Sequence, residues 1–185
     1  MTRRAWIGLG GNQGDRAAYL RAAVAALRAH PDVALGAVSG VWETEYVGPG
    51  TQDPYLNACA ALATDLGPAA LVAVLKELEA AAGRPADGHM KPRPIDLDLV
   101  LYEGFAGRDG SVVVPHARAR ERAFVLEPLA QIAPDARFPD SGETVAAACA
   151  NIRRKPGPWV RLRTDLSLAP GGPDDGKEER GAALA

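Results

Sequence analysis

Apolar residues in the first hundred positions follow a strand-like pattern in four stretches. These stretches are residues 5–9, 33–43, 55–64 and 95–102. Gly36 and Gly40 interrupt the second stretch, and glycines inside a strand pattern predict bulges or bends. We therefore expect four strands, of which the second is bent.

Two further stretches repeat apolar residues every three or four positions, which predicts amphipathic helices. The first helix begins after a cap at Asp15 and ends before Pro31, and the second begins at Pro68 and closes at Gly83. The apolar positions are Leu20, Val24 and Leu27 in the first helix and Leu71, Val74, Leu75 and Leu78 in the second.

The predicted order is strand, helix, strand, strand, helix, strand, which is the ferredoxin-like βαββαβ pattern. It predicts an α+β fold in which helices cover one face of an antiparallel sheet and leave the other face free for a ligand. A short strand at residues 112–114 and a helix from about residue 120 to 132 are expected as C-terminal additions. We expect a single domain over residues 1–164 and a disordered tail over residues 165–185, because the end of the chain is rich in glycine and charge.

The fourth strand carries two carboxylates where a buried strand has none. Alternation along the strand predicts that Asp96 and Asp98 share one face, opposite Ile95, Leu97, Leu99 and Leu101. Two acids on one face repel each other unless a cation lies between them, and Mg²⁺ takes one or two carboxylates together with substrate phosphates. Arg93, just upstream, is a donor suited to phosphate. The stretch therefore predicts phosphoryl transfer, although the same pattern also occurs on a solvated sheet face.

Positive charge gathers around this strand and shortly after it. The basic residues are Arg84, His89, Lys91, Arg93, His116, Arg118, Arg120 and Arg122. A basic cluster opposite two acids fits a polyphosphate bridged to a metal ion. Solvated arginines on a helix are the alternative, and we expect that alternative for Arg118 and Arg120.

Tyr55 and Asn57 share one face of the third strand. An aromatic ring beside an amide suits a flat heterocycle, because the ring stacks and the amide bonds the edge. An edge tyrosine beside a solvated asparagine is the alternative interpretation.

Composition narrows the class of protein. The chain has 185 residues, 47% hydrophobic and 24% charged, as expected for one globular domain, and its net charge of −2 gives no reason to expect a nucleic acid partner. No apolar run is long enough to span a bilayer, and the N-terminus runs straight into a strand rather than a signal segment. The two cysteines lack metal spacing. We expect a cytoplasmic monomer without a membrane or nucleic acid partner.

Several motifs occur in order between about Trp6 and Pro139. They are GLGGNQGDR at residues 8–16, VS at 38–39, YLNA at 55–58, PRPIDLD at 92–98, PH at 115–116, ERAFVL at 121–126 and PL at 128–129. Together they resemble the 6-hydroxymethyl-7,8-dihydropterin pyrophosphokinase family of folate biosynthesis. The resemblance implies transfer of a pyrophosphoryl group from ATP to the hydroxymethyl oxygen of the pterin, with release of AMP.

The resemblance also implies roles for residues of this chain. Asp96 and Asp98 would hold two Mg²⁺ ions, and Arg84 and Arg93 would assist catalysis. The residues implied for the ATP side are Glu79, Arg93, His116 and Arg122. Lys91, which stands where the chain departs from the family, is expected to supply replacement charge on the same side. For the pterin side they are Thr44, Val47, Tyr55, Asn57 and Phe124, with the two rings sandwiching the heterocycle.

The sequence departs from the family pattern in several places, among them the first turn and the loop before Arg93. The first turn reads Gly10-Gly11-Asn12 where the family usually has Gly-Ser-Asn. His89-Met90-Lys91 stands where the family usually has Arg-Trp-Gly, and that loop is about one residue shorter. Two alternatives therefore stay open. The chain is a pyrophosphokinase paralogue that acts on another hydroxymethyl heterocycle, or it is a non-catalytic ferredoxin-like module that binds a small molecule.

Overall fold

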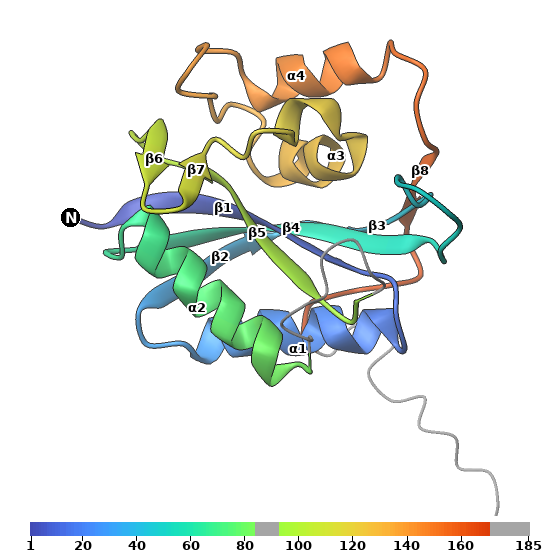
Figure 1. Cartoon of the computed structure of the whole chain (residues 1–185), viewed down its shortest axis with the longest axis horizontal. Helices are drawn as coiled ribbons and strands as arrows, with labels where there is room; N and C mark the ends of the chain where they lie inside the picture. The colour runs from blue at the N-terminus through green and yellow to red at the C-terminus, as the bar shows by residue number, and fades with distance from the viewer. Residues whose placement is uncertain (84–92, 171–185) are drawn as a thin grey trace, which may run out of the picture.

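The computed structural model describes residues 1–83 and 93–170 of the chain. Its main sheet is antiparallel, with strand order β5-β1-β4-β3-β8 and with β2 also paired to β4 (Figure 1). The strands of this sheet are β1 (Arg3–Gly11), β2 (Val33–Val38), β3 (Val41–Thr44), β4 (Tyr55–Thr64), β5 (Asp96–Tyr102) and β8 (Val160–Arg163). The remaining elements are α1 (Arg16–Ala29), α2 (Pro68–Ala81), β6 (Gly107–Asp109), β7 (Val112–Val114), the 3₁₀ turn Ala119–Glu121, α3 (Ala123–Ile132) and α4 (Val145–Ile152).

The predicted ferredoxin-like α+β core is confirmed. The strands and helices from β1 to β5 follow the expected βαββαβ order, and the expected second strand is divided into β2 and β3 near Gly40. Both parts pair with β4, so the division leaves the topology unchanged. The hairpin strand β6, the helix α4 and the edge strand β8 were not predicted individually.

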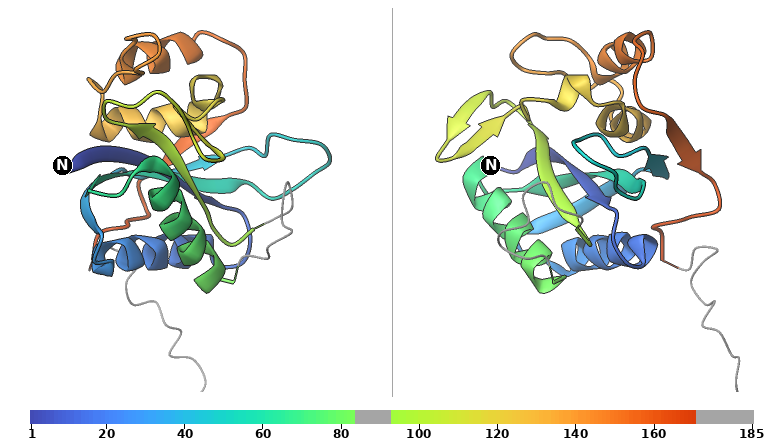
Figure 2. Two further views of the ribbon diagram at one scale, coloured as in Figure 1. Left: turned by 60° about the vertical axis from the view of Figure 1, so that its left-hand side comes forward. Right: turned by 45° about the vertical axis from the view of Figure 1, so that its right-hand side comes forward.

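Helices α1 and α2 cover one face of the sheet (Figure 2). The side chain of Asp15 caps α1 by accepting from the Ala18 N–H at 2.9 Å, and Pro68 occupies the first turn of α2. We call the apolar layer on this face the first core; its helical members include Leu20, Val24, Leu27, Leu71 and Leu75. These are predicted positions, which shows how directly the helical spacing reports the buried face.

The opposite face of the sheet is only partly free, which corrects the expectation of a fully open face. Helices α3 and α4 pack over part of it and form a second core (Figure 2). That core contains Trp6, Cys59, Leu126, Leu129 and Phe138. The apolar spacing of residues 120–132 predicts a helix but contains no information about the sheet face on which the helix docks.

A β-bulge in β5 changes the predicted alternation. The pairing of β1 with β5 shifts between Trp6, which faces Leu101, and Ile7, which faces Leu99, so Val100 is an extra residue. Leu97 and Leu99 enter the first core as expected, but Leu101 lies in the second core. The prediction that Leu101 shares their face is therefore wrong.

The end of the described chain crosses from one face of the sheet to the other. Strand β8 extends the sheet beside β3, and the following segment brings Leu168 into the first core, where it is buried (Figure 1). Residues 165–170 thus belong to the described structure, whereas residues 171–185 of the expected tail lie outside it. No helix in the described part of the chain is both long and apolar enough to cross a membrane.

Candidate active site

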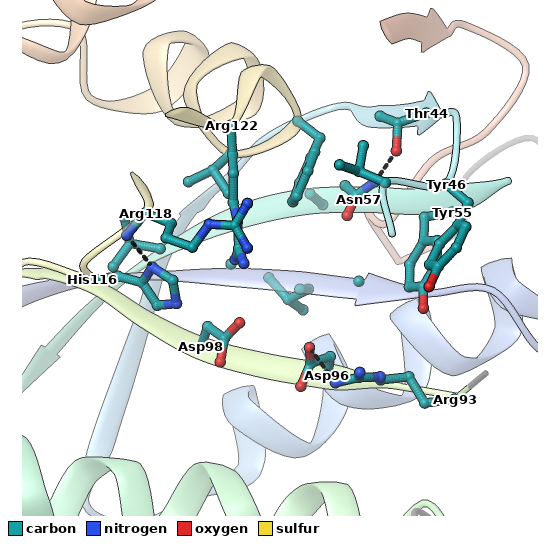
Figure 3. Close-up of a pocket in the computed structure, with 18 of the residues that line it drawn as sticks. Thr44, Tyr46, Tyr55, Asn57, Arg93, Asp96, Asp98, His116, Arg118 and Arg122 are labelled. Carbon is teal, nitrogen blue, oxygen red and sulfur yellow. Dashed lines mark hydrogen bonds and ion pairs between the residues drawn. The ribbon is translucent and has the colours of Figure 1, made fainter. Parts of the chain in front are cut away.

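A pocket of about 480 Å³ occupies the part of the second face that α3 and α4 leave uncovered (Figure 3). Its walls come from β1, β3, β4, β5, α2, α3 and the segments that follow β3 and β7. It brings together ten of the predicted site residues: Thr44, Val47, Tyr55, Asn57, Arg93, Asp96, Asp98, His116, Arg122 and Phe124. Residues separated by up to eighty positions in sequence therefore line one cavity.

Part of the pocket wall is formed by neutral side chains, and we call this part the neutral end: Thr44, Tyr55, Asn57 and Phe124. It adjoins the charged part directly, because Arg93 interacts with Tyr55 and the Arg122 guanidinium lies 5.6 Å from the centre of the Phe124 ring. The Asn57 amide donates to Thr44 Oγ1 at 3.0 Å, and both residues are buried (Figure 3). Gly10 lies beside them, because a Cβ at this position would come within 2.9 Å of Asn57 Oδ1. The hydrogen bond and the glycine together fix the orientation of the amide.

Tyr55 is held by its aromatic neighbour Tyr46. The two rings are stacked with centroids 6.3 Å apart and an interplanar angle of 17°. Burial raises the pKa of Tyr55, so its hydroxyl keeps its proton at neutral pH. Tyr46 lines the pocket but was not predicted as a site residue, because its contribution depends on the path of the loop that follows β3.

The other end, the acid end, contains Asp96 and Asp98 together with the cations around them. On the neighbouring strand, Gly10 pairs with Asp96 and Gly8 pairs with Asp98. Because glycine has no side chain, nothing on β1 covers the two carboxylates. Arg93 Nη1 donates to Asp96 Oδ2 at 2.9 Å (Figure 3).

Lys76 on α2 also lines the acid end, and it was not predicted. Its Nζ lies 2.7 Å from Glu79 Oε1, 3.2 Å from the Leu97 carbonyl and 4.0 Å from Asp96 Oδ1. Glu79 does not line the pocket; it is buried and accepts from the Leu97 N–H at 2.6 Å. In the sequence, the three-residue spacing of Lys76 and Glu79 indicates only that they can pair on one helix turn. Their place at the acid end depends on the docking of α2 against β5, which the spacing does not predict.

His116 is tied to β5 and to the following turn. The backbone N–H of His116 donates to the Val100 carbonyl at 2.9 Å. The ring Nδ1 of His116 accepts from the backbone N–H of Arg118 at 3.2 Å (Figure 3). Burial is the main cause of a lowered pKa for His116, so the ring is neutral at pH 7. With Nδ1 accepting, the proton of the neutral ring resides on Nε2.

Arg122 and Arg118 supply further positive charge beside His116 (Figure 3). Burial first, and then the charge of Arg118, lower the pKa of Arg122, but a guanidinium stays protonated at neutral pH. Arg118 was expected to be solvated, and its side chain is indeed exposed, but it also lines the pocket. Arg120, also expected to be solvated, instead pairs with Asp140 and lies 4.2 Å from the centre of the Phe138 ring. The structure therefore assigns these two arginines different surroundings.

The donor set of the acid end fits Mg²⁺. Two carboxylates, both partly exposed to the pocket, project from one strand face with no side chain over them from β1. Hard oxygen ligands of this kind, left open for substrate phosphates, are what Mg²⁺ uses in phosphate-transfer sites. Within residues 1–83 and 93–170, no group of three His, Cys, Asp or Glu side chains could form a closed metal cage. Arg84 and Lys91, which were predicted to act here, lie outside the described residues.

A pocket that combines paired acids, several cations and neutral side chains suited to a flat ring is typical of an enzyme that transfers phosphate groups. The family model for 7,8-dihydro-6-hydroxymethylpterin-pyrophosphokinase (HPPK) matches residues 6–134, and the chain belongs to this family.

Curated relatives agree with the family model. The chain is 46% identical over 149 residues to the 2-amino-4-hydroxy-6-hydroxymethyldihydropteridine pyrophosphokinase of Methylorubrum extorquens, which covers 80% of this chain and 93% of the relative. It is 40% identical to the Bacillus subtilis protein of the same name, and the match covers 71% of this chain and 79% of the relative. It is 37% identical to the Pseudomonas aeruginosa protein, and that match covers 85% of this chain and 99% of the relative.

Solved structures agree at the level of the fold. Wild-type Plasmodium falciparum HPPK-DHPS with STZ-DHP superposes with a TM-score of 0.63 at 11% identity, over 82% of this chain and 43% of the solved one. The same protein with pteroate gives a TM-score of 0.60 at 13% identity, over 82% and 42%. This chain therefore spans less than half of those longer chains, and the likeness concerns the fold of that part.

Proposed function

We propose that this chain transfers the pyrophosphoryl group of ATP to the hydroxymethyl group of 6-hydroxymethyl-7,8-dihydropterin, a step of folate biosynthesis, and releases AMP. The observation that carries the proposal is the division of one pocket into a neutral end and an acid end, in a chain that belongs to the HPPK family. A flat, neutral acceptor and a charged triphosphate need two such environments next to each other.

The neutral end is assigned to the pterin. Tyr55 and Phe124 supply aromatic surface for stacking, and Thr44, Asn57 and the backbone near Val47 supply hydrogen-bonding groups for the ring edge. Support comes from the bond between Asn57 and Thr44, which orients the amide before any ligand binds. A preorganised edge reduces the entropy that is lost when the pterin is ordered.

The acid end is assigned to the triphosphate and its metal ions. Asp96 and Asp98 would hold two Mg²⁺ ions, and the bound metal would neutralise negative charge that develops on the phosphates during transfer. Arg93 and Arg122 bind phosphate oxygens, and His116 donates from Nε2 to them. Arg84 and Lys91 are proposed to add charge from the loop before Arg93.

Lys76 and Glu79 complete the acid end. The position of Lys76, 4.0 Å from Asp96, favours a direct contact with the nucleotide phosphates. Glu79 is buried against the backbone of Leu97, so we assign it to holding Lys76 and the strand on the ATP side. Catalysis then consists of positioning and charge neutralisation, because this reaction leaves little covalent work to the protein.

Product analysis tests the proposal. Purified protein is incubated with ATP, Mg²⁺ and 6-hydroxymethyl-7,8-dihydropterin, and the nucleotide products are separated by chromatography. We expect AMP and the pterin diphosphate in equal amounts. ADP instead of AMP would indicate ordinary phosphoryl transfer, and AMP formed only with another hydroxymethyl heterocycle would replace the acceptor. Ligand binding without any product would favour the binding module.

The same preparation tests the metal requirement and the oligomeric state, and the location needs a separate experiment. We propose that the enzyme needs Mg²⁺, so chelation abolishes AMP formation and added Mg²⁺ restores it. We propose a monomer, and light scattering after gel filtration measures the mass. We propose a cytoplasmic location, which fractionation of the source cells tests.

A further inference from the structure

Arg118 lies in the turn that follows β7, and its side chain is held only loosely by the protein. In the described part of the chain, its guanidinium makes one ion pair, from Nε to Glu121 Oε2 at 3.5 Å. Both side chains of that pair are well exposed, Arg118 at 59% and Glu121 at 68%. An exposed pair of this length contributes little to stability, so the pair does not explain why an arginine stands at this position.

The Arg118 side chain nonetheless lies against the pocket. Arg118 lines the acid end beside His116 and Arg122, whereas its partner Glu121 does not line the pocket (Figure 3). The contact with Glu121 uses Nε, and the two terminal nitrogens of the guanidinium make no hydrogen bond to any described residue. These nitrogens are therefore available to a ligand.

Arg118 and Arg122 form a pair of like charges. Burial is the main cause of the lowered pKa of Arg122 and the charge of Arg118 is the next, so the two guanidiniums lie close enough to repel each other. The Arg122 guanidinium lies 5.6 Å from the centre of the Phe124 ring and, within the described chain, donates no hydrogen bond. Two neighbouring cations of this kind are stabilised when an anion binds between them.

The groups around the two arginines define the anion that fits. His116 adds a third donor, because its Nδ1 accepts from the Arg118 backbone N–H at 3.2 Å and its ring proton therefore resides on Nε2. Asp98 faces these donors and is near enough for its charge to act on His116 and on Arg122 (Figure 3). Asp98 would repel a simple anion, whereas a polyphosphate that carries a metal ion presents oxygens to the arginines and the metal to the carboxylate.

We propose that Arg118 is a further phosphate-binding residue, which exchanges Glu121 for an oxygen of the ATP triphosphate so that Arg118 and Arg122 hold the triphosphate between them. The inference rests on the proposed function for the identity of the polyphosphate. In the empty pocket Glu121 is the partner of Arg118, and it competes with the phosphate for the guanidinium. The exchange loses little free energy, because the contact that it breaks is single and exposed.

Binding calorimetry with a non-hydrolysable ATP analogue and Mg²⁺ tests this role without turnover. We expect Arg118→Ala to weaken the analogue by about tenfold, from the loss of a hydrogen-bonded charge. The affinity for 6-hydroxymethyl-7,8-dihydropterin should change by less than about twofold, because the variant keeps the backbone N–H that orients His116. Unchanged affinity for the analogue would overturn the proposal, and so would an equal loss of affinity for the pterin.

Glu121→Gln tests the exchange from the other side. The substitution removes the charge that competes for Arg118, so the ATP analogue should bind about two- to fivefold more tightly. In the double variant with Arg118→Ala this gain should shrink, because no arginine remains to be released. A gain of the same size in both backgrounds would indicate only general repulsion by Glu121 and would overturn the exchange, as would the absence of any gain.

Arg118→Lys replaces Arg118→Ala if the alanine variant does not fold. Lysine keeps the positive charge but lacks the planar group with two terminal nitrogens. We therefore expect a loss of affinity for the ATP analogue in the same direction and smaller than tenfold. Wild-type affinity in Arg118→Lys, with Arg118→Ala unfolded, would overturn the proposal.

Arg154→Ala is the matched control, because Arg154 is an exposed arginine after α4 that does not line the pocket. It changes the net charge as Arg118→Ala does, and it should bind the ATP analogue as the wild type does. An equal loss in both variants would indicate an effect of net charge and would overturn the proposal.

Failure of this proposal is distinct from failure of the proposed function. A wild type that forms AMP while Arg118→Ala binds the ATP analogue normally rejects the role of Arg118 alone. A wild type that forms no AMP rejects the proposed function, whatever the affinities of the variants.

Discussion

The two ends of the pocket are built in different ways. At the neutral end the protein satisfies its own polar groups, as Asn57 and Thr44 do, and the shape exists before a ligand arrives. At the acid end the charged groups are partly exposed and paired with each other, as Arg93 and Asp96 are. A ligand at the neutral end fits an existing surface, whereas a ligand at the acid end must exchange partners with the protein. The two ends should therefore respond differently to substitution and to salt.

The largest effect is expected from Asp98→Asn. Removing one of the two carboxylates removes charge that the metal and the phosphates need, and we expect kcat/KM to fall by about 10³-fold. Because Asp98 is only partly buried, the midpoint of thermal unfolding should change little. AMP formation and thermal unfolding are measured side by side, with the exposed Asp135→Asn as control. Wild-type activity in Asp98→Asn would remove the acid end from the mechanism.

Asn57→Ala is expected to impair binding at the neutral end and to leave the acid end unchanged. It removes the oriented amide and leaves Thr44 without its donor, so we expect the KM for the pterin to rise about 10–100-fold, from a loss of about 1–3 kcal/mol. The KM for ATP should stay within about twofold of the wild type. Steady-state kinetics with each substrate varied in turn gives both values. An equal rise in both would show that the two ends are not separable.

Glu43→Gln provides a comparison with a carboxylate outside the pocket. Glu43, which directly precedes Thr44 in the sequence, is buried and is paired with Arg16, Arg161 and Arg163. We expect the substitution to lower the free energy of unfolding by about 1–3 kcal/mol at pH 7, with little change in kcat. Chemical denaturation measures the first quantity and AMP formation the second.

The ion pairs of Glu43 also determine how the difference in stability between wild type and Glu43→Gln depends on pH. Burial alone would raise the pKa of Glu43, but the ion pairs with Arg161, Arg163 and Arg16 outweigh it and lower the pKa below the ordinary value of 4.5. A lowered pKa means that the stabilisation is complete above pH 4.5 and is lost as the pH falls through the folded-state value. The difference in stability between wild type and Glu43→Gln should therefore shrink below pH 4.5. A difference that is constant from pH 7 to pH 3 would contradict the role of these ion pairs.

The smallest effect is expected from salt. Raising the ionic strength shortens the range of exposed charge interactions, so the affinity for the ATP analogue should fall several-fold between about 0.05 and 0.5 M salt. Affinity for the pterin alone should change by less than about twofold, because the neutral end binds through packing and buried hydrogen bonds. Calorimetry at several salt concentrations measures both affinities. An equal salt dependence for the ATP analogue and the pterin would show that the two ends do not differ in this way.

The predictable part of the molecule is the part with a local signal. Leu20, Leu27 and Leu71 follow helical spacing and are buried as expected, and the alternation that pairs Asp96 with Asp98 places both in the pocket. The bulge at Val100 has no such signal, because the extra residue is defined by the partner strand rather than by β5. Lys76 and Tyr46 were missed for a related reason. Their position in the pocket depends on where α2 and the loop after β3 dock, which no pattern within either segment specifies.

The pairing of β8 with β3 has a consequence for the order in which the chain is made. Synthesis proceeds from the N-terminus, so every described residue that lines the pocket leaves the ribosome before Val160–Arg163 does. Until then β3 is an unpaired sheet edge, and Glu43 lacks two of its three arginine partners. A nascent chain released before residue 159 would carry the described pocket residues and still expose that edge to other chains. Completion of the sheet is thereby delayed until after the described pocket residues have been made.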